Sequence, residues 1–163
     1  MKYCANCGQL LIVKIIDNRE RMVCTDEHCG YIHWNNPVPV VAMIVETVAG
    51  IVLAHNKMIP PGFYSIITGF LEAGEDPALA AARETKEELG LDAVQTTFLG
   101  VFPFIKFNQL IIAYHIQATG NIVLNEELDD YKFVLREDLL GYNRSGRFEI
   151  TEWLEKLRVL EEA

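Results

Sequence analysis

No cysteine occurs after residue 29, although the first 29 residues of this 163-residue chain contain four. A secreted domain stapled by disulfides would usually distribute its cysteines, so this clustering argues against that class of protein. The sequence also lacks any apolar run near the ~20 residues of a membrane helix. Its first residues lack the apolar segment of a signal peptide. We therefore expect a soluble cytoplasmic protein with no membrane partner.

Basic residues are few, since 14 Lys and Arg stand against 23 Asp and Glu and give a formal net charge of −9. Binding to nucleic acid depends on basic side chains that neutralise phosphates, so this balance argues against a nucleic-acid partner. The same charge is compatible with a phosphate-containing substrate if metal ions supply positive charge. Half of the residues are apolar, which is enough for one ordinary domain with a small addition.

Residues 1–36 differ from the rest of the chain and form a separate predicted unit. They hold every cysteine, a β-rich stretch at residues 10–16 and a turn at Asp17-Asn18. We expect a second domain over residues 37–163. Its predicted strands are 40–45, 50–54, 65–68, 96–102, 109–118 and 131–135, and a terminal helix is predicted over 149–160. Strands outnumber helices, which favours an α+β fold.

The clearest predicted helix covers residues 76–89. Asp76 suits the N-terminal cap, Pro77 suits the first helical position, and Gly90 suits the stop after the last turn. The helical repeat of 3.6 residues predicts a buried face that carries Leu79, Ala82 and Leu89.

Three glutamates of this helix share one face, because Glu84, Glu87 and Glu88 are spaced at i, i+3 and i+4. Like charges at this spacing repel one another, which is explained if cations bind among them. Carboxylate oxygens are the ligands that Mg²⁺ and Mn²⁺ prefer, and these ions assist phosphoryl chemistry. The alternative is a solvated acidic face whose charge is offset by Arg83 and Lys86.

The wider pattern favours the metal site. Residues 69–91 read GFLEAGEDPALAAARETKEELGL and resemble the Nudix box, G-x5-E-x7-R-E-U-x-E-E-x-G-U, where U is a bulky apolar residue. Every fixed position matches, from Gly69 and Glu75 through Arg83 and the glutamates to Gly90. The one departure is Thr85, where the family has an aliphatic residue, and we expect it to weaken packing more than chemistry.

The resemblance to the Nudix family implies an α/β/α sandwich around a mixed sheet, with the box forming a loop, a helix and a loop. It implies that Glu84, Glu87 and Glu88 hold Mg²⁺ or Mn²⁺ together with the carbonyl oxygen of Gly69. Glycine at position 69 would permit a sharp turn and a close approach of the backbone to the metal. Arg83 would pair with a box glutamate, which we take to be Glu75, and fix the geometry.

The family often adds a glutamate from a later loop as a ligand or general base, and Glu126 and Glu127 are the candidates by position. The predicted catalytic set is Glu75, Arg83, Glu84, Glu87, Glu88 and Glu127. Glu72 is a candidate contact to metal or substrate, or else a plain loop acid. Phe104 and Gln109 are candidate substrate contacts, Phe104 by stacking on a base. Their alternative is ordinary strand and loop packing.

The four cysteines form two pairs, Cys4-x2-Cys7 and Cys24-x4-Cys29, and a glycine follows each pair. Two such pairs on two turns can meet as a tetrahedral thiolate site for a structural Zn²⁺. The spacer of the second pair is wider than usual, and His28 is an alternative ligand. The other interpretation is a set of free core thiols or disulfides.

A zinc ribbon before a Nudix domain resembles the NADH pyrophosphatase branch and the related FAD and ADP-ribose hydrolases. Residues 31–37 (YIHWNNP) and 68–75 (TGFLEAGE) are also similar to that branch. The resemblance implies hydrolysis of the phosphoanhydride bond in a nucleoside diphosphate linked to another group, which gives two monophosphates. The S-Q-P-W-P-F-P-x-S array of NADH pyrophosphatases is mostly replaced by GVFPFIKFN at residues 100–108, so the small-molecule substrate is not fixed.

The alternative function is a non-catalytic sensor that binds a nucleotide and acts through a protein partner. The intact acidic set argues against it, since binding alone does not require all of these glutamates. Relatives commonly form homodimers, and on that basis alone a homodimer is expected here.

Overall fold

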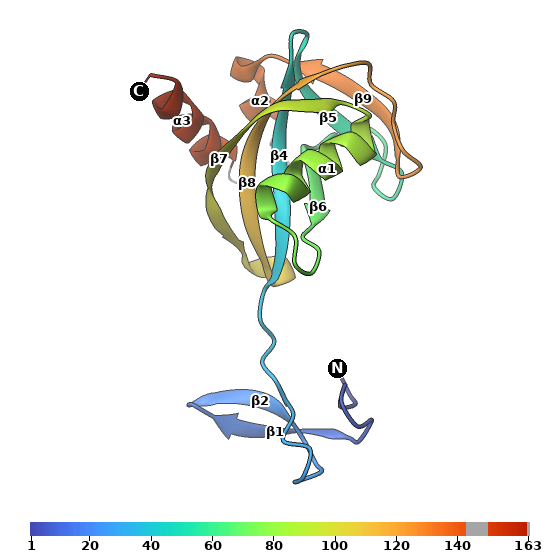
Figure 1. The fold of residues 1–163 in the computed structure, drawn as a ribbon, viewed down its shortest axis with the longest axis vertical. Helices are drawn as coiled ribbons and strands as arrows, with labels where there is room; N and C mark the ends of the chain where they lie inside the picture. Colours follow the sequence, from blue (N-terminus) through green and yellow to red (C-terminus); the bar gives the residue numbers. More distant parts are fainter. Residues whose placement is uncertain (143–149, 163) are drawn as a thin grey trace. The chain divides into compact units, whose positions relative to one another are not determined.

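A computed structural model describes residues 1–142 and 150–162. The chain folds as two compact units, Met1–Pro37 and Val38–Ala163. Each unit has its own sheet, shown for the whole chain in Figure 1. Within the described ranges, no helix is long and apolar enough to cross a membrane.

The first unit is a three-stranded antiparallel sheet in the order β1 (Leu11–Ile16), β2 (Arg19–Cys24) and β3 (Ile32–His33). Asp17 and Asn18 join β1 to β2 with φ values of 50° and 60°, the left-handed conformation that a two-residue hairpin turn requires. The turn predicted at these residues is confirmed. The pairing strand β2 was not predicted, because Arg19–Cys24 begins with three charged residues and shows no apolar alternation.

The second unit contains a six-stranded mixed sheet in the order β7-β8-β4-β5-β9, with β6 paired to β4 beside this path. Its strands are β4 (Val38–Thr47), β5 (Gly50–Asn56), β6 (Ile67–Phe70), β7 (Asp92–Phe104), β8 (Gln109–Thr119) and β9 (Leu128–Val134). Its helices are α1 (Pro77–Leu89), α2 (Arg136–Tyr142) and α3 (Ile150–Glu161), with a 3-10 turn at Ile105–Phe107. Strands β4 and β8 are parallel, and the other pairs among the described strands are antiparallel.

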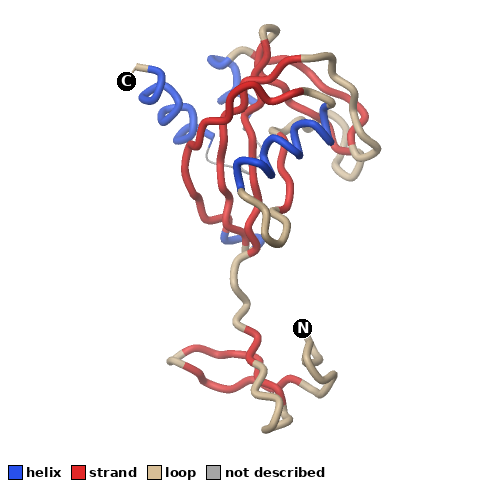
Figure 2. Tube along the Cα trace, in the orientation of Figure 1, coloured by secondary structure: helices blue, strands red, loops and turns tan. Residues whose placement is uncertain are grey.

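Helices cover both faces of this sheet (Figures 1 and 2). The α1-side core includes Val41, Met43, Val45, Ala80, Ala81 and Leu89. The α3-side core includes Val40, Ala42, Ile44, Leu139, Trp153 and Leu157. Successive side chains of β4 enter opposite cores because they alternate across the sheet. The predicted α/β/α sandwich around a mixed sheet is confirmed.

Helix α1 begins and ends where its caps predict. The Asp76 carboxylate accepts hydrogen bonds from the amides of Ala78 and Leu79, and Gly90 ends the helix with φ 72°. The bounds of the other elements differ from the predicted ones by a few residues. The strand predicted at 65–68 is β6 at Ile67–Phe70, and α2 was not predicted at all. The terminal helix begins at Ile150, and its predicted first residue, Glu149, lies outside the described residues.

The buried face of α1 agrees with the prediction at Leu89 and differs from it at Leu79. Leu79 is 68% exposed, whereas Ala80, Ala81, Thr85 and Leu89 are buried. Two alanines at the contact let the helix lie close to the sheet, which a leucine there would prevent. Thr85 is fully buried, and its hydroxyl donates to the Ala81 carbonyl at 2.8 Å. Because this bond satisfies the hydroxyl within the helix, Thr85 buries no unpaired polar group. The threonine therefore does not destabilise the core in that way.

Candidate functional site

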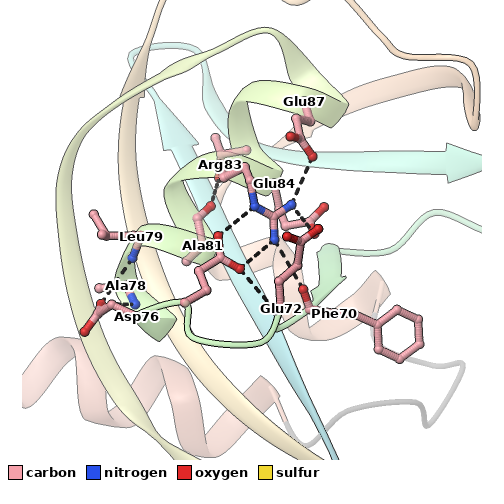
Figure 3. Close-up of polar contacts among 11 residues, drawn as sticks. Phe70, Glu72, Asp76, Ala78, Leu79, Ala81, Arg83, Glu84 and Glu87 are labelled. Carbon is pink, nitrogen blue, oxygen red and sulfur yellow. Dashed lines mark hydrogen bonds and ion pairs between the residues drawn. The ribbon is translucent and has the colours of Figure 1, made fainter.

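Arg83 is the centre of the polar network on α1, which Figure 3 shows in close-up. Its Nε lies 2.7 Å from Glu75 Oε1, and its Nη2 lies 2.9 Å from Glu75 Oε2. This two-pronged contact holds the loop before α1 against the middle of the helix. The pairing of Arg83 with Glu75, which the resemblance implied, is thus present in the structure.

The same guanidinium also contacts two glutamates of α1. Its Nη1 lies 2.8 Å from Glu84 Oε1 and 3.0 Å from Glu87 Oε2. Its Nη2 donates to the carbonyl of Phe70 at 3.3 Å, at the end of β6. Arg83 therefore fixes the box loop, the acidic helix face and the end of a sheet strand relative to one another. The hydrogen bond from Arg83 is the main reason that the pKa of Glu75 is lowered.

Gly69 lies within β6, paired with Val41 of β4, and not in the sharp turn that the sequence analysis expected. A Cβ at this position would lie 2.0 Å from Cδ of Glu84 and 2.2 Å from its Oε1. The glycine is therefore required because the Glu84 carboxyl group rests on the strand backbone. This contact brings a carboxylate and the main chain of position 69 to one place.

Glu88 does not join the Arg83 network. It lines a cavity of about 320 Å³ together with Glu127, which belongs to the loop before β9. The pKa of Glu88 is raised to about 8, first by burial and then by the negative charges of Glu84, Glu127 and Glu87. Among the described residues no basic side chain is paired with Glu88.

The structure separates the two glutamates that the sequence could not distinguish. Glu127 lines the cavity with Glu88, whereas Glu126 is not among its lining residues. The amide of Glu127 donates to Asn125 Oδ1 at 3.0 Å, and the carbonyl of Glu126 accepts from Lys57 Nζ at 2.7 Å. These two bonds set the direction of the loop, so that consecutive side chains reach different surroundings.

The donor set of the box fits a hard divalent cation by its chemistry. Glu84 and Glu87 contact an arginine that is already paired with Glu75, and Glu88 and Glu127 line the cavity, so carboxylates outnumber the basic group. Oxygen donors with this excess of negative charge are the ligands of Mg²⁺ and Mn²⁺. The carboxylates do not all converge on one point: Glu84 and Glu87 lie on Arg83, whereas Glu88 lines the cavity.

The predicted substrate contacts lie in two places. Glu72 is exposed in the loop before α1, and its amide donates to Glu75 Oε2 at 3.2 Å. Phe104 and Gln109 face each other across β7 and β8, and Phe104 packs against the α3-side core. The structure therefore brings Phe104 and Gln109 together, but on the sheet face opposite to α1.

Three polar residues that complete the cavity were not predicted from the sequence. Asn56, Ser65 and Thr68 line it beside Glu88 and Glu127. Asn56 ends β5, Ser65 precedes β6 and Thr68 lies within it, and no motif marks them. The available signal was their position, because polar residues that directly follow a buried strand often reach a functional surface.

The four cysteine sulfurs form the second candidate site. Cys4 Sγ lies 3.7 Å from Cys29 Sγ, and Cys7 Sγ lies 3.5 Å from Cys24 Sγ. All four ligand atoms lie within 4.8 Å of one another, and none of the cysteines is in a disulfide. Tetrahedral Zn²⁺ with Zn–S bonds of about 2.3 Å requires sulfurs about 3.8 Å apart. The sulfur geometry therefore fits Zn²⁺.

Backbone amides favour the thiolate of one of these cysteines, Cys4, whereas burial raises the pKa of Cys24. Burial raises the pKa of the Cys4 thiol, but the amides of Cys7 and Asn6 lower it more, to about 7. Gly8 and Gly30 follow the two pairs with φ values of 75° and 66°, which lets each loop turn back. Among the described residues, His28 does not join the sulfur group, so the alternative of a histidine ligand is wrong.

Three features together define the class of protein. They are a mixed sheet between helices, a complete acidic box on one helix and a ribbon with four sulfurs. The chain belongs to the Nudix family: the NUDIX domain profile matches residues 36–154. The profile described as Nudix N-terminal, a zinc ribbon, matches residues 2–35.

Curated relatives cover much of this chain. NAD-capped RNA hydrolase NudC of Pseudomonas aeruginosa is 28% identical over 131 residues, which are 79% of this chain and 46% of that protein. NAD-capped RNA hydrolase NUDT12 of Homo sapiens is 24% identical over 156 residues, which are 90% of this chain and 33% of that protein. The chain therefore spans less than half the length of these relatives.

Solved structures show the same fold. A NUDIX hydrolase from Nitrosomonas europaea matches with a TM-score of 0.78 and 22% identity, over 96% of this chain and 89% of that chain. An Ap4A hydrolase from C. elegans matches with a TM-score of 0.61 and 20% identity, over 76% of this chain and 98% of that chain. At this level of identity the two structures support the fold alone.

Proposed function

We propose that the protein hydrolyses the phosphoanhydride bond of a nucleoside diphosphate linked to a second group. The observation that carries this proposal is the complete acidic box around Arg83, with Glu88 and Glu127 lining one cavity. Water attacks one phosphorus, the P–O bond to the bridging oxygen breaks, and two monophosphates leave. A sensor would not need this full set of carboxylates.

The proposed roles follow from the contacts. Glu75 and Arg83 position the acidic face, while Glu84, Glu87, Glu88 and the Gly69 carbonyl would hold Mg²⁺ or Mn²⁺. When bound, the ion neutralises phosphate oxygens and lowers the pKa of water. Glu127 is the proposed base, because its carboxylate lies at the cavity and can take the proton of the attacking water. The zinc of the ribbon is proposed to be structural, since four sulfurs leave no open position.

NAD-type dinucleotides are the first substrates to test. The curated relatives NudC and NUDT12 are named as NAD-capped RNA hydrolases, and both cover most of this chain. Exposed Phe70 directly follows Gly69 and offers a ring to a base, whereas Phe104 packs against the core on the sheet face opposite to α1. FAD and ADP-ribose share the same diphosphate linkage and are the next candidates. A homodimer stays a prediction.

The direct test is a hydrolysis screen of NADH, FAD, ADP-ribose, diadenosine polyphosphates and nucleotide sugars with Mg²⁺ or Mn²⁺. Glu87→Gln should lower kcat by roughly 100-fold or more, because it removes a proposed metal ligand. The side chain of Glu87 is 57% exposed, so the unfolding temperature should change little. Equal turnover by the parent and the variant would remove the catalytic assignment.

A matched pair of loop variants tests the proposed base. Glu127→Gln should lower kcat by about 100-fold or more, the usual contribution of a general base. Glu126→Gln changes the same charge one residue away, outside the cavity, and should leave kcat within about twofold. If both variants lose activity equally, loop charge and not a positioned base explains the effect.

A further inference from the structure

The formal charge of the molecule is divided unevenly between its units. Residues 1–37 contain four basic and four acidic residues, so the remaining residues carry the whole net charge of −9. The acidic balance that disfavours a nucleic-acid partner is that of the whole chain. It applies to the Nudix unit, which repels polyanions, but not to the ribbon.

One face of the ribbon sheet carries only basic and uncharged side chains. Lys14 of β1 lies directly opposite Arg21 of β2. Arg19 precedes Arg21 by two residues and therefore lies on the same face of β2. Strand alternation sends Glu20 to the other face, opposite Ile15. Lys14 and Arg19 are exposed, and neither forms an ion pair within the described part of the ribbon.

An exposed indole extends this row of cations. Arg21 stacks on Trp34, with its Cζ 5.3 Å from the ring centroid, and donates to the Trp34 carbonyl. Trp34 is 44% exposed although it is a large aromatic residue. Lys14, Arg21 and Trp34 therefore form one row across the sheet. We call these three residues and Arg19 the basic face.

The arrangement of the basic face costs stability unless an anion binds there. Like charges directly opposite each other on paired strands are destabilising, and Lys14 opposite Arg21 is such a pair. Cations combined with an aromatic ring are the means by which proteins hold single-stranded nucleic acid, since phosphates meet the cations and a base stacks on the ring. Membrane-binding basic clusters usually contain about four to eight cations, more than this face offers.

We propose that the basic face of the ribbon binds single-stranded nucleic acid. Lys14, Arg19 and Arg21 contact phosphates, and Trp34 stacks on a base. This inference goes beyond the proposed hydrolase activity and does not depend on it, because the basic face lies wholly within the ribbon.

The test is fluorescence anisotropy of the full zinc-loaded protein with a labelled RNA of about 12 nucleotides, a length within known site sizes. The RNA carries a 5′-hydroxyl group, so it offers no diphosphate to the Nudix unit. The logarithm of the association constant should fall linearly with the logarithm of the salt concentration between about 50 and 200 mM.

The double variant Lys14→Gln/Arg19→Gln should remove two phosphate contacts. For single strands this lowers the salt slope by about 1.4 and the affinity roughly 25-fold at 0.1 M salt. Lys106→Gln/Lys156→Gln removes the same charge from exposed positions of the other unit and should leave the affinity within about twofold. Trp34→Leu should weaken binding about fivefold or more with an unchanged slope, as expected for a lost base stack.

Zinc content and hydrolysis of a small dinucleotide should be the same in the parent and in all three variants. The proposal is overturned if the parent does not bind RNA at 50 mM salt, or if the two double variants weaken binding equally. It is also overturned if vesicles of phosphatidylserine and phosphatidylcholine displace the RNA from the parent at equal anion concentration, because the basic face would then be a lipid site.

Discussion

The ribbon and the Nudix unit differ in how they arrange ionisable side chains, which are gathered in the ribbon and separated in the Nudix unit. In the ribbon, four sulfurs are gathered within 4.8 Å, and the buried apolar cluster around them is small. In the Nudix unit, large cores on both sides of the sheet stabilise the fold, and the carboxylates stay apart on Arg83 and in the cavity. We expect from this difference that the ribbon depends on zinc for its fold, whereas the Nudix unit folds without a metal ion.

The largest expected effect is the loss of the ribbon when zinc is removed. Structural zinc sites contribute about 10–16 kcal/mol of apparent binding free energy, so a strong chelator or Cys24→Ser should unfold residues 1–37. Hydrogen exchange should show β1 and β2 unprotected while β4 and β8 keep their protection. Equal loss of protection in both units would mean that they fold together and would end the comparison.

The next largest effect is expected from the substitution Gly69→Ala. The new Cβ would overlap the Glu84 carboxyl group, so this carboxylate must move, and kcat should fall roughly 100-fold as for other ångström-scale displacements. The fold should survive, because the overlapping atoms belong to a flexible side chain. In a Glu84→Ala background the same substitution should cost no stability. A similar loss of stability in both backgrounds would show that the backbone, and not Glu84, demands glycine.

A smaller effect is expected from the ion network that joins β4 to α2. Glu46 accepts from Arg136 Nε at 2.8 Å and contacts buried His115 at 2.7 Å. Burial raises the pKa of Glu46, but its bonds to Arg136 and His115 outweigh burial, so the pKa lies below its ordinary value. The stabilisation is therefore present at neutral pH and is lost as the pH falls through the lowered pKa.

Glu46→Gln should accordingly lower the free energy of unfolding of the Nudix unit by about 2 kcal/mol at pH 7. The difference from the parent should shrink at an acidic pH that lies below the lowered pKa of Glu46, because the glutamate of the parent is then protonated. Urea unfolding at both pH values measures it. A difference that does not change with pH would show that the charge of Glu46 is not what stabilises this contact.

The smallest expected effect is that of Thr85→Val. The hydroxyl and the carbonyl of Ala81 form a buried bond, and the substitution removes the donor while the carbonyl keeps its place in the helix. The change in unfolding free energy should stay within about 1 kcal/mol. A larger loss would show that the fold depends on the hydrogen bond from the Thr85 hydroxyl, which an aliphatic side chain cannot form.

Local chemistry explains which parts of the fold the sequence predicts. The bounds of α1 follow from Asp76, Pro77 and Gly90, and these signals are read without knowledge of the sheet. Its buried face depends on which side meets β4, so the choice of Leu79 was wrong. The box pattern likewise predicts the Arg83–Glu75 pair. It cannot predict that Glu88 lines a cavity with Asn56 and Ser65, because distant strands supply that wall.

The parallel pairing of β4 with β8 bears on how the protein folds. Val38 pairs with Gln109, and everything from β5 through α1 to β7 lies between them in the chain. Contacts between residues so far apart in sequence close a long loop, which slows folding. Gly69 borders the same strand β4 through Val41. We therefore expect refolding chains to form α1 early and to regain turnover only in the slowest kinetic phase, when the central strand is enclosed.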